Sequence, residues 1–158
     1  MIDMDKLFNE IRDDEGSRSW KYLCSELYPT IGVGHRVRDS DPEAALETFD
    51  VFADDVPEDQ CISDERIREL FETDVAVAIQ TCEKIYSNWD DLPPEAQHVL
   101  CNMSFQLGEG TLRKFKGMNA AVAEQDFAEM AKQMIDSRWA RQTPERAQRL
   151  ERRVLALI

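Results

Sequence analysis

The residues best suited to chemistry gather near the start of the chain. Glu15 stands in the run DDEG, Cys24 follows in a segment of strand-forming residues, and Thr30 opens the segment TIGVGH. A carboxyl group held at a helix end against apolar side chains such as Trp20 and Tyr22 favours its protonated form and could act as a general acid. The alternative is a solvated helix end without a chemical role.

The four cysteines favour free thiols over a metal site or disulfides. They are Cys24, Cys61, Cys82 and Cys101. No two form a CxxC pair, and His35 and His98 are the only histidines that could complete a zinc site. The chain begins with an amphipathic acidic segment in place of an apolar secretory leader, and no apolar run approaches the roughly 18 residues of a membrane span. We therefore expect reduced thiols, no metal and synthesis in a reducing compartment.

Hydrophobic spacing predicts the elements that must position these residues. It indicates a short helix over 4–11 ended by Gly16 and a β-meander over 18–38. Asp41 should cap a short helix that begins at Pro42 and ends at about residue 48. Ser63 should cap a long helix, and Pro94 should begin another that runs towards Gly108. Shorter helices follow over 111–118, 119–124 and 126–136, and Thr143 caps a final one. Strands segregated from helices indicate an α+β fold, mostly helical.

The charge is strongly negative and unevenly distributed. The 158 residues hold 19 Lys and Arg against 32 Asp and Glu, a net charge of −13. Residues 1–110 carry a net −17, whereas residues 111–158 carry +4. This balance argues against non-specific binding of nucleic acid and against docking on anionic lipid. An anionic partner should meet the C-terminal third.

Five segments, in the same order, resemble blocks of the phage-type lysozymes, glycoside hydrolase family 24. They are DEG at 14–16, PTIGVGH at 29–35, ISDERIRELFETDV at 62–75, NMSFQLGEG at 102–110 and SRWARQTPERAQR at 137–149. The resemblance implies one lysozyme domain over 1–158. Its β-rich lobe would span about 17–62, its connecting helix about 63–88, and its helical lobe about 92–158 together with the N-terminal helix.

The resemblance also implies an endolysin that hydrolyses the β-1,4 bond between N-acetylmuramic acid and N-acetylglucosamine in peptidoglycan, without a cofactor. Glu15 occupies the position of the family's general acid, and Thr30 that of the threonine thought to place the attacking water. Cys24 stands where the family typically has aspartate. A thiolate could attack the anomeric carbon or accept a proton from water, and Cys24 could also merely pack. The sequence leaves these alternatives open, as well as a catalytically degenerate peptidoglycan-binding module on the same fold.

Further residues match the family's supporting positions. Arg146 would orient the catalytic glutamate, and His35 with Asp74 would form a structural ion pair. The sugar cleft would be contacted by Arg36, Phe105, Met118 and Gln133. The resemblance implies a monomer made in a host cytoplasm without a signal peptide. It would act on the cell wall after release, through a holin if phage-derived.

Overall fold

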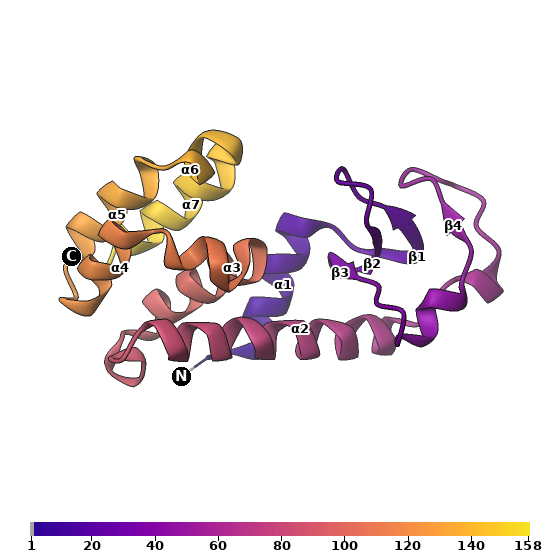
Figure 1. The fold of residues 1–158 in the computed structure, drawn as a ribbon, viewed down its shortest axis with the longest axis horizontal. Coiled ribbons are helices and arrows are strands. Elements are labelled where there is room, and N and C mark those ends of the chain that lie inside the picture. Colours follow the sequence, from indigo (N-terminus) through magenta and orange to yellow (C-terminus); the bar gives the residue numbers. More distant parts are fainter. Residues whose placement is uncertain (1) are drawn as a thin grey trace. The chain divides into compact units, whose positions relative to one another are not determined.

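The computed structural model describes residues 2–158, which divide into two compact units (Figure 1). One unit comprises Met4–Asp74, and the other comprises Val75–Ile158 with residues 2–3. The strands are confined to the first unit and the second is helical, so the predicted α+β class is confirmed. No helix within residues 2–158 is long and apolar enough to cross a bilayer.

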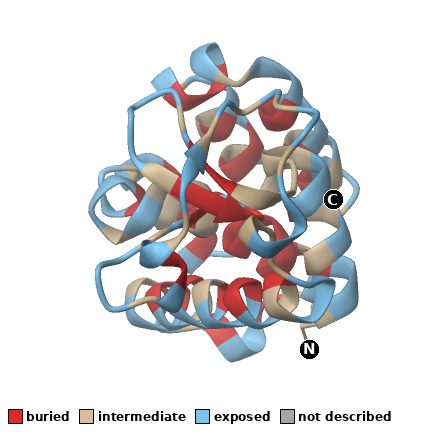
Figure 2. Cartoon of the chain, turned by 90° about the vertical axis from the view of Figure 1, so that its right-hand side faces the viewer, coloured by how far each residue is buried: buried red, intermediate tan, exposed pale blue. Residues whose placement is uncertain are grey.

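The first unit is built on a four-stranded sheet beside two helices. Its strand order is β3-β2-β1-β4, with β1–β2 and β2–β3 antiparallel and β4 parallel to β1. The buried residues of the sheet lie mainly in β2 and at Lys21, Tyr22 and His35, and most residues of the surrounding loops are exposed (Figure 2). In chain order its elements are α1 (Met4–Glu15), β1 (Arg18–Leu23), β2 (Pro29–Gly32), β3 (His35–Arg36), the 3-10 helix η1 (Pro42–Ala45), β4 (Thr48–Phe49), the 3-10 helix η2 (Glu58–Gln60) and the start of α2 (Asp64–Ile85).

Helix α1 places Glu15 at its last residue. Leu7 and Ile11, one turn apart, are completely buried and fix which face of the helix packs inward. Gly16 follows with φ +77, and its amide donates to the carbonyl of Arg12 at 2.8 Å. Glycine adopts this left-handed conformation without steric cost, so the predicted helix stop is confirmed.

The segment after β3 differs from the sequence prediction. The short helix expected to reach residue 48 is a 3-10 turn that ends at Ala45, and Thr48–Phe49 form β4 instead. Asp41 makes no capping hydrogen bond to the turn because its carboxylate accepts from the Arg38 amide and from the His35 ring. Without that cap the turn does not continue into an α-helix.

The second unit contains the end of α2 and a set of shorter helices. They are the 3-10 helix η3 (Trp89–Asp91), α3 (Pro94–Arg113), α4 (Lys116–Ala123), α5 (Phe127–Ile135), α6 (Arg138–Gln142) and α7 (Pro144–Leu155). Every residue of α3 from Ala96 to Ser104 is buried, so α3 contributes a large part of this unit's core. Gly108 interrupts α3 with φ +78.

Two expectations about this unit are wrong. The predicted boundary at residues 118 and 119 falls inside α4, because the turn lies earlier, at Lys114 and Phe115. Thr143 precedes α7, yet its hydroxyl donates to the carbonyl of Trp139 at 3.0 Å and caps nothing. Ser63, in contrast, accepts from the Arg66 amide at 3.1 Å, so the predicted cap of α2 is confirmed.

Candidate active site

Glu15, Cys24 and Thr30 all belong to the unit Met4–Asp74. Glu15 ends α1, Cys24 directly follows β1, and Thr30 lies in β2. Glu15 and Cys24 are half-buried, and Thr30 is buried. The elements that carry these residues are consecutive along the chain, so their positions depend on short connections.

The side chain of Glu15 lies against the backbone of Gly34. A Cβ atom added to Gly34 would stand 3.5 Å from Cβ and 3.7 Å from Cδ of Glu15. Gly34 has φ +63, a conformation that side chains rarely adopt, at the turn between β2 and β3. The glycine therefore serves both the turn and the close approach of a carboxyl group.

Cys24 and Thr30 are joined by the β1–β2 hairpin. The Cys24 amide donates to the Tyr28 carbonyl at 3.0 Å, and the Thr30 hydroxyl donates to the same carbonyl at 2.8 Å. Burial alone would raise the pKa of the Cys24 thiol. Hydrogen bonds with the backbone of Tyr28 and Glu26 and with the Thr30 side chain outweigh it, so the pKa lies below its ordinary value. This environment favours the thiolate, the reactive form of cysteine.

Tyr22, which the sequence analysis expected as an apolar neighbour of the Glu15 carboxyl, also interacts electrostatically with Cys24. Burial raises the pKa of its hydroxyl, the Arg18 charge lowers it, and the charges of Cys24 and Glu15 raise it again. Tyr22 therefore lies within electrostatic range of both candidate catalytic groups. The register of the sheet agrees with this placement, because Tyr22 is the cross-strand partner of Thr30.

His35 is held between two carboxylates. Its Nδ1 lies 2.7 Å from Oδ2 of Asp74, and its Nε2 lies 2.8 Å from Oδ2 of Asp41. Burial alone would lower the pKa of His35, but the hydrogen bonds and charges of Asp74 and Asp41 raise it above the ordinary value. The contact with Asp74 matches the expected ion pair, and the contact with Asp41 was not foreseen. Together they tie β3 to α2 and to the segment before η1.

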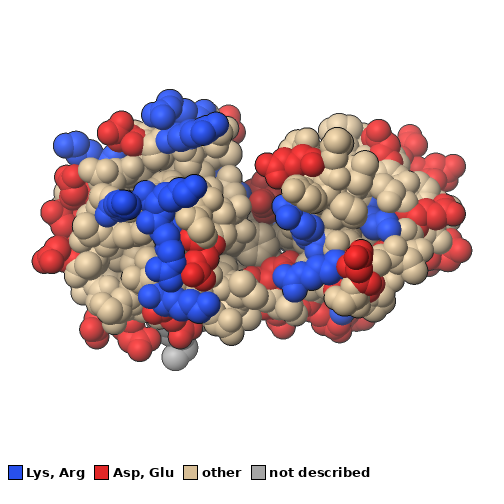
Figure 3. All heavy atoms as spheres, viewed as in Figure 1, with Lys and Arg blue, Asp and Glu red and all other residues tan. Residues whose placement is uncertain are grey.

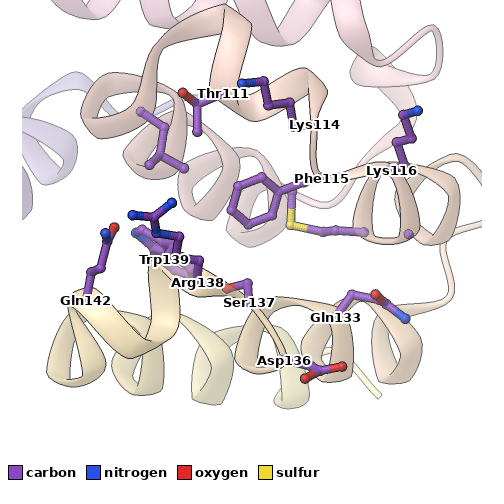
Figure 4. A pocket seen from close by; sticks show the side chains of 13 residues that line it. Thr111, Lys114, Phe115, Lys116, Gln133, Asp136, Ser137, Arg138, Trp139 and Gln142 are labelled. Atoms are coloured by element: carbon purple, nitrogen blue, oxygen red, sulfur yellow. The ribbon is translucent and has the colours of Figure 1, made fainter.

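The helical unit contains a pocket of about 590 Å³ (Figure 4). The rings of Phe115 and Trp139 meet edge to face in it, with centroids 6.3 Å apart. Its wall holds three basic side chains and one acidic side chain among aromatic and amide groups. It is lined by Leu107, Thr111, Lys114, Phe115, Lys116, Gly117, Met118, Gln133, Asp136, Ser137, Arg138, Trp139 and Gln142.

Two of the predicted substrate-binding residues, Met118 and Gln133, line this pocket. Met118 is 1% exposed and can contribute apolar wall but no polar contact. The amide of Gln133 lies directly over Gly117, where an added Cβ would stand 2.5 Å from Oε1, and it donates to Glu129 at 2.9 Å. The missing side chain at Gly117 thus makes room for the amide of Gln133. The sequence analysis had not linked these two positions.

Comparison with known proteins decides the family. The phage lysozyme family profile matches residues 12–156. The chain belongs to the phage lysozyme family. It is 32% identical to two proteins of Dictyostelium discoideum named probable T4-type lysozyme 1 and 2, over 89% of this chain and 88% of each relative. It is also 32% identical to the pre-baseplate central spike protein Gp5 of Enterobacteria phage T4, over 89% of this chain and 26% of that protein.

The activity of this phage lysozyme family member is hydrolysis of peptidoglycan. The other predicted site residues are Arg36, Phe105 and Arg146. Arg36 lies in β3 beside the hairpin, and its guanidinium covers the ring of Tyr28. Phe105 is half-buried in α3 and does not line the pocket. Arg146 is buried, and its Nε donates to Oδ1 of Asn102 at 2.8 Å, while its pairing with Glu15 stays a prediction.

Proposed function

We propose that this phage lysozyme family member cleaves the β-1,4 bond between N-acetylmuramic acid and N-acetylglucosamine, with Glu15 as the general acid. The proposal rests on one observation above all. The half-buried Glu15 carboxyl lies against the Gly34 backbone in the same compact unit as Cys24 and Thr30. A carboxylic acid and a second group that can handle a proton are the two parts that glycoside hydrolysis requires.

In the proposed reaction, the proton of the Glu15 carboxyl goes to the glycosidic oxygen as the bond from that oxygen to the anomeric carbon breaks. The departing sugar then leaves as a neutral alcohol, which removes the cost of expelling an alkoxide. The positive charge that develops on the ring is met by an attacking group on the opposite face. Arg146 would orient the Glu15 carboxyl for this step.

We propose that Cys24 acts on a water molecule held by the Thr30 hydroxyl. The water oxygen bonds to the anomeric carbon, and the water proton passes to the Cys24 thiolate. Glu15 then regains its proton as Cys24 loses one, by exchange with solvent. The lowered pKa of Cys24 supports this assignment, as does the Tyr28 carbonyl that accepts from both the Cys24 amide and the Thr30 hydroxyl. Together they favour a thiolate close to a hydroxyl oxygen that can accept a hydrogen bond from water.

We propose that four further residues contact the glycan. Arg36 is proposed to contact it beside the hairpin, and Met118 and Gln133 through the aromatic pocket, with Phe105 as a further apolar contact. The basic side chains of the pocket suit an anionic polymer. Lys and Arg gather in a band across one face of the helical unit (Figure 3). A monomer that reaches the wall through a separate pore, such as a holin, completes the proposal.

The test is lysis and product analysis with Glu15→Gln. We expect hydrolysis of purified walls to fall about 10²–10⁴-fold, the usual effect of losing a general acid. Asp13→Asn is the matched control, because it makes a similar change at an exposed position of the same helix and should lyse walls at close to the wild-type rate. Thermal melts should show both variants folded.

The products identify the bond. After borohydride reduction, cleavage at the proposed bond leaves N-acetylmuramic acid as the reduced end sugar, and reduced N-acetylglucosamine would contradict the assignment. A Glu15→Gln protein that lyses walls at more than about a tenth of the wild-type rate would show that another residue is the acid. A wild-type protein that binds walls without releasing any reducing ends would favour the degenerate binding module.

A further inference from the structure

The guanidinium of Arg36 lies over an aromatic ring beside the candidate site. The carbon at the centre of its guanidinium group is 3.6 Å from the centroid of the Tyr28 ring. Both residues are exposed, with Tyr28 at 43%. At this distance the ring face attracts the cation and also restricts its orientation.

The sheet places this pair beside the proposed catalytic residues. Arg36 is the cross-strand partner of Thr30, which in turn is the partner of Tyr22. Cross-strand partners project from the same face of a sheet, with Cβ atoms about 5 Å apart. The carbonyl of Tyr28 also accepts from the Thr30 hydroxyl and from the Cys24 amide. The stacked pair therefore shares its backbone support with Cys24 and Thr30.

Arg36 differs from Arg66 and Arg68 of its unit in its charged partners, although Arg68 also lies over a ring, that of Phe8. Arg66 binds Glu43 and Glu69, and Arg68 binds Asp5 and Glu72 through their carboxylates. Stacking uses the face of the guanidinium and none of its N–H groups. The in-plane N–H edge is the part that binds a carboxylate with two parallel hydrogen bonds. The ring thus orients a cation without neutralising it, in a unit rich in acidic residues.

We infer that Arg36, oriented by Tyr28, is a specificity-determining residue that selects glycan strands carrying a carboxylate next to the cleaved bond. The inference rests on the proposed function. N-acetylmuramic acid differs from N-acetylglucosamine by a lactyl group that ends in a carboxyl. That carboxyl is either free or joined to a peptide that bears carboxylates of its own. Either source supplies the same chemistry to the guanidinium edge.

Binding measurements with three strands test the inference. Calorimetry would use Glu15→Gln protein, so that no strand is consumed. The strands are peptide-free glycan with free lactyl carboxylates, the same glycan with those carboxylates converted to methylamides, and glycan that keeps its peptides. The methylamide strand is the neutral control, since it differs from the first by one charged group for each N-acetylmuramic acid unit.

We expect a carboxylate-bearing strand to bind about three- to tenfold more tightly than the methylamide strand at low salt, and Arg36→Leu to abolish this preference. The preference should shrink when ionic strength rises from about 0.01 M to about 0.15 M. Arg36→Lys should keep part of it, because lysine retains the charge without the planar fork. Tyr28→Leu should weaken the preference, whereas Tyr28→Phe, which keeps a ring, should not.

Each outcome either supports or refutes the role of Arg36. If Arg36→Leu removes a preference for free lactyl carboxylates, the lactyl group is the partner of Arg36. If Arg36→Leu loses affinity only for peptide-bearing strands, the partner is the peptide. An equal loss on all three strands, or no loss on any, overturns the inference while leaving the proposed function standing. A Glu15→Gln protein that binds none of the strands refutes the proposed function together with it.

Discussion

The clamp of two carboxylates around His35 makes a sharp prediction about stability. The side chains of His35, Asp41 and Asp74 are 6%, 19% and 23% exposed, so the clamp is mostly but not fully buried. Breaking a buried ion pair costs about 3–5 kcal/mol, whereas an exposed pair contributes less than about 1 kcal/mol. We therefore expect Asp74→Asn to lower the free energy of unfolding by about 2–3 kcal/mol near pH 6.

The effect should depend on pH in a defined direction. The pKa of His35 is raised in the folded protein, so its contribution is complete below its unfolded pKa of about 6.5 and is lost as pH rises through the folded pKa. The pKa of Asp41 is lowered: burial opposes this, but hydrogen bonds from the Arg38 amide and the His35 ring outweigh it. Its contribution is present above its unfolded pKa and is lost as pH falls. Stability from the clamp is therefore greatest between these limits.

Urea unfolding curves at a series of pH values would measure this. Glu83→Gln is the matched control, because it removes one carboxylate from an exposed position of the same helix, α2, and should change stability by less than about 0.5 kcal/mol. The difference between Asp74→Asn and wild type should narrow as pH rises through the folded pKa of His35. A loss no larger than the control at pH 6, or a loss that stays constant into alkaline pH, would refute the reasoning.

Two predictions concern the candidate site and the pocket. In turbidity assays, Cys24→Ala and Cys24→Ser should each lower the rate of wall hydrolysis by an order of magnitude or more. Cys24→Asp should stay active, because its carboxylate is ionised at neutral pH. A Cys24→Ala variant that lyses walls as fast as wild type would show that Cys24 only packs. Gly117→Ala should displace the Gln133 amide and raise the apparent KM about two- to fivefold, while a thermal melt shows no loss of stability because alanine favours the helix. Gly110→Ala is its control, since an added Cβ there meets nothing within 4 Å. An equal KM in both variants would show that the contact between Gly117 and Gln133 does not affect substrate binding.

Local chemistry made part of this fold predictable. Helix α1 shows a clear apolar face and a glycine stop, and α2 begins at a serine that caps it. The same chemistry failed at Asp41 and Thr143, whose residue types predict caps. Each side chain is engaged elsewhere, Asp41 by His35 and Thr143 by the carbonyl of Trp139. These competing partners are set by tertiary structure, which residue type alone does not encode.

In the candidate site, too, contacts between chain neighbours were predictable and contacts between distant elements were not. The roles of Cys24 and Thr30 were predicted from the family resemblance, and their proximity follows from the single hairpin that joins neighbouring positions in the chain. Strand β4 could not be predicted, since two residues show no alternating pattern and its pairing with β1 is made across a long loop. The contact between Gly117 and Gln133 joins two helices, and a glycine gives no indication of which side chain will fill the space it leaves.

The residues proposed to perform the chemistry are joined by shorter chain connections than the pocket residues proposed to bind the glycan. Glu15, Cys24 and Thr30 lie within one unit, where the Gly34 turn, the hairpin carbonyl of Tyr28 and the clamp on His35 fix their backbone. The pocket belongs to the other unit and is lined from α3 to α6. Substitutions in the pocket should therefore change KM before they change kcat, whereas substitutions around the hairpin should change kcat first. This separation lets the binding surface vary in charge and shape while the proton-transfer groups keep their geometry.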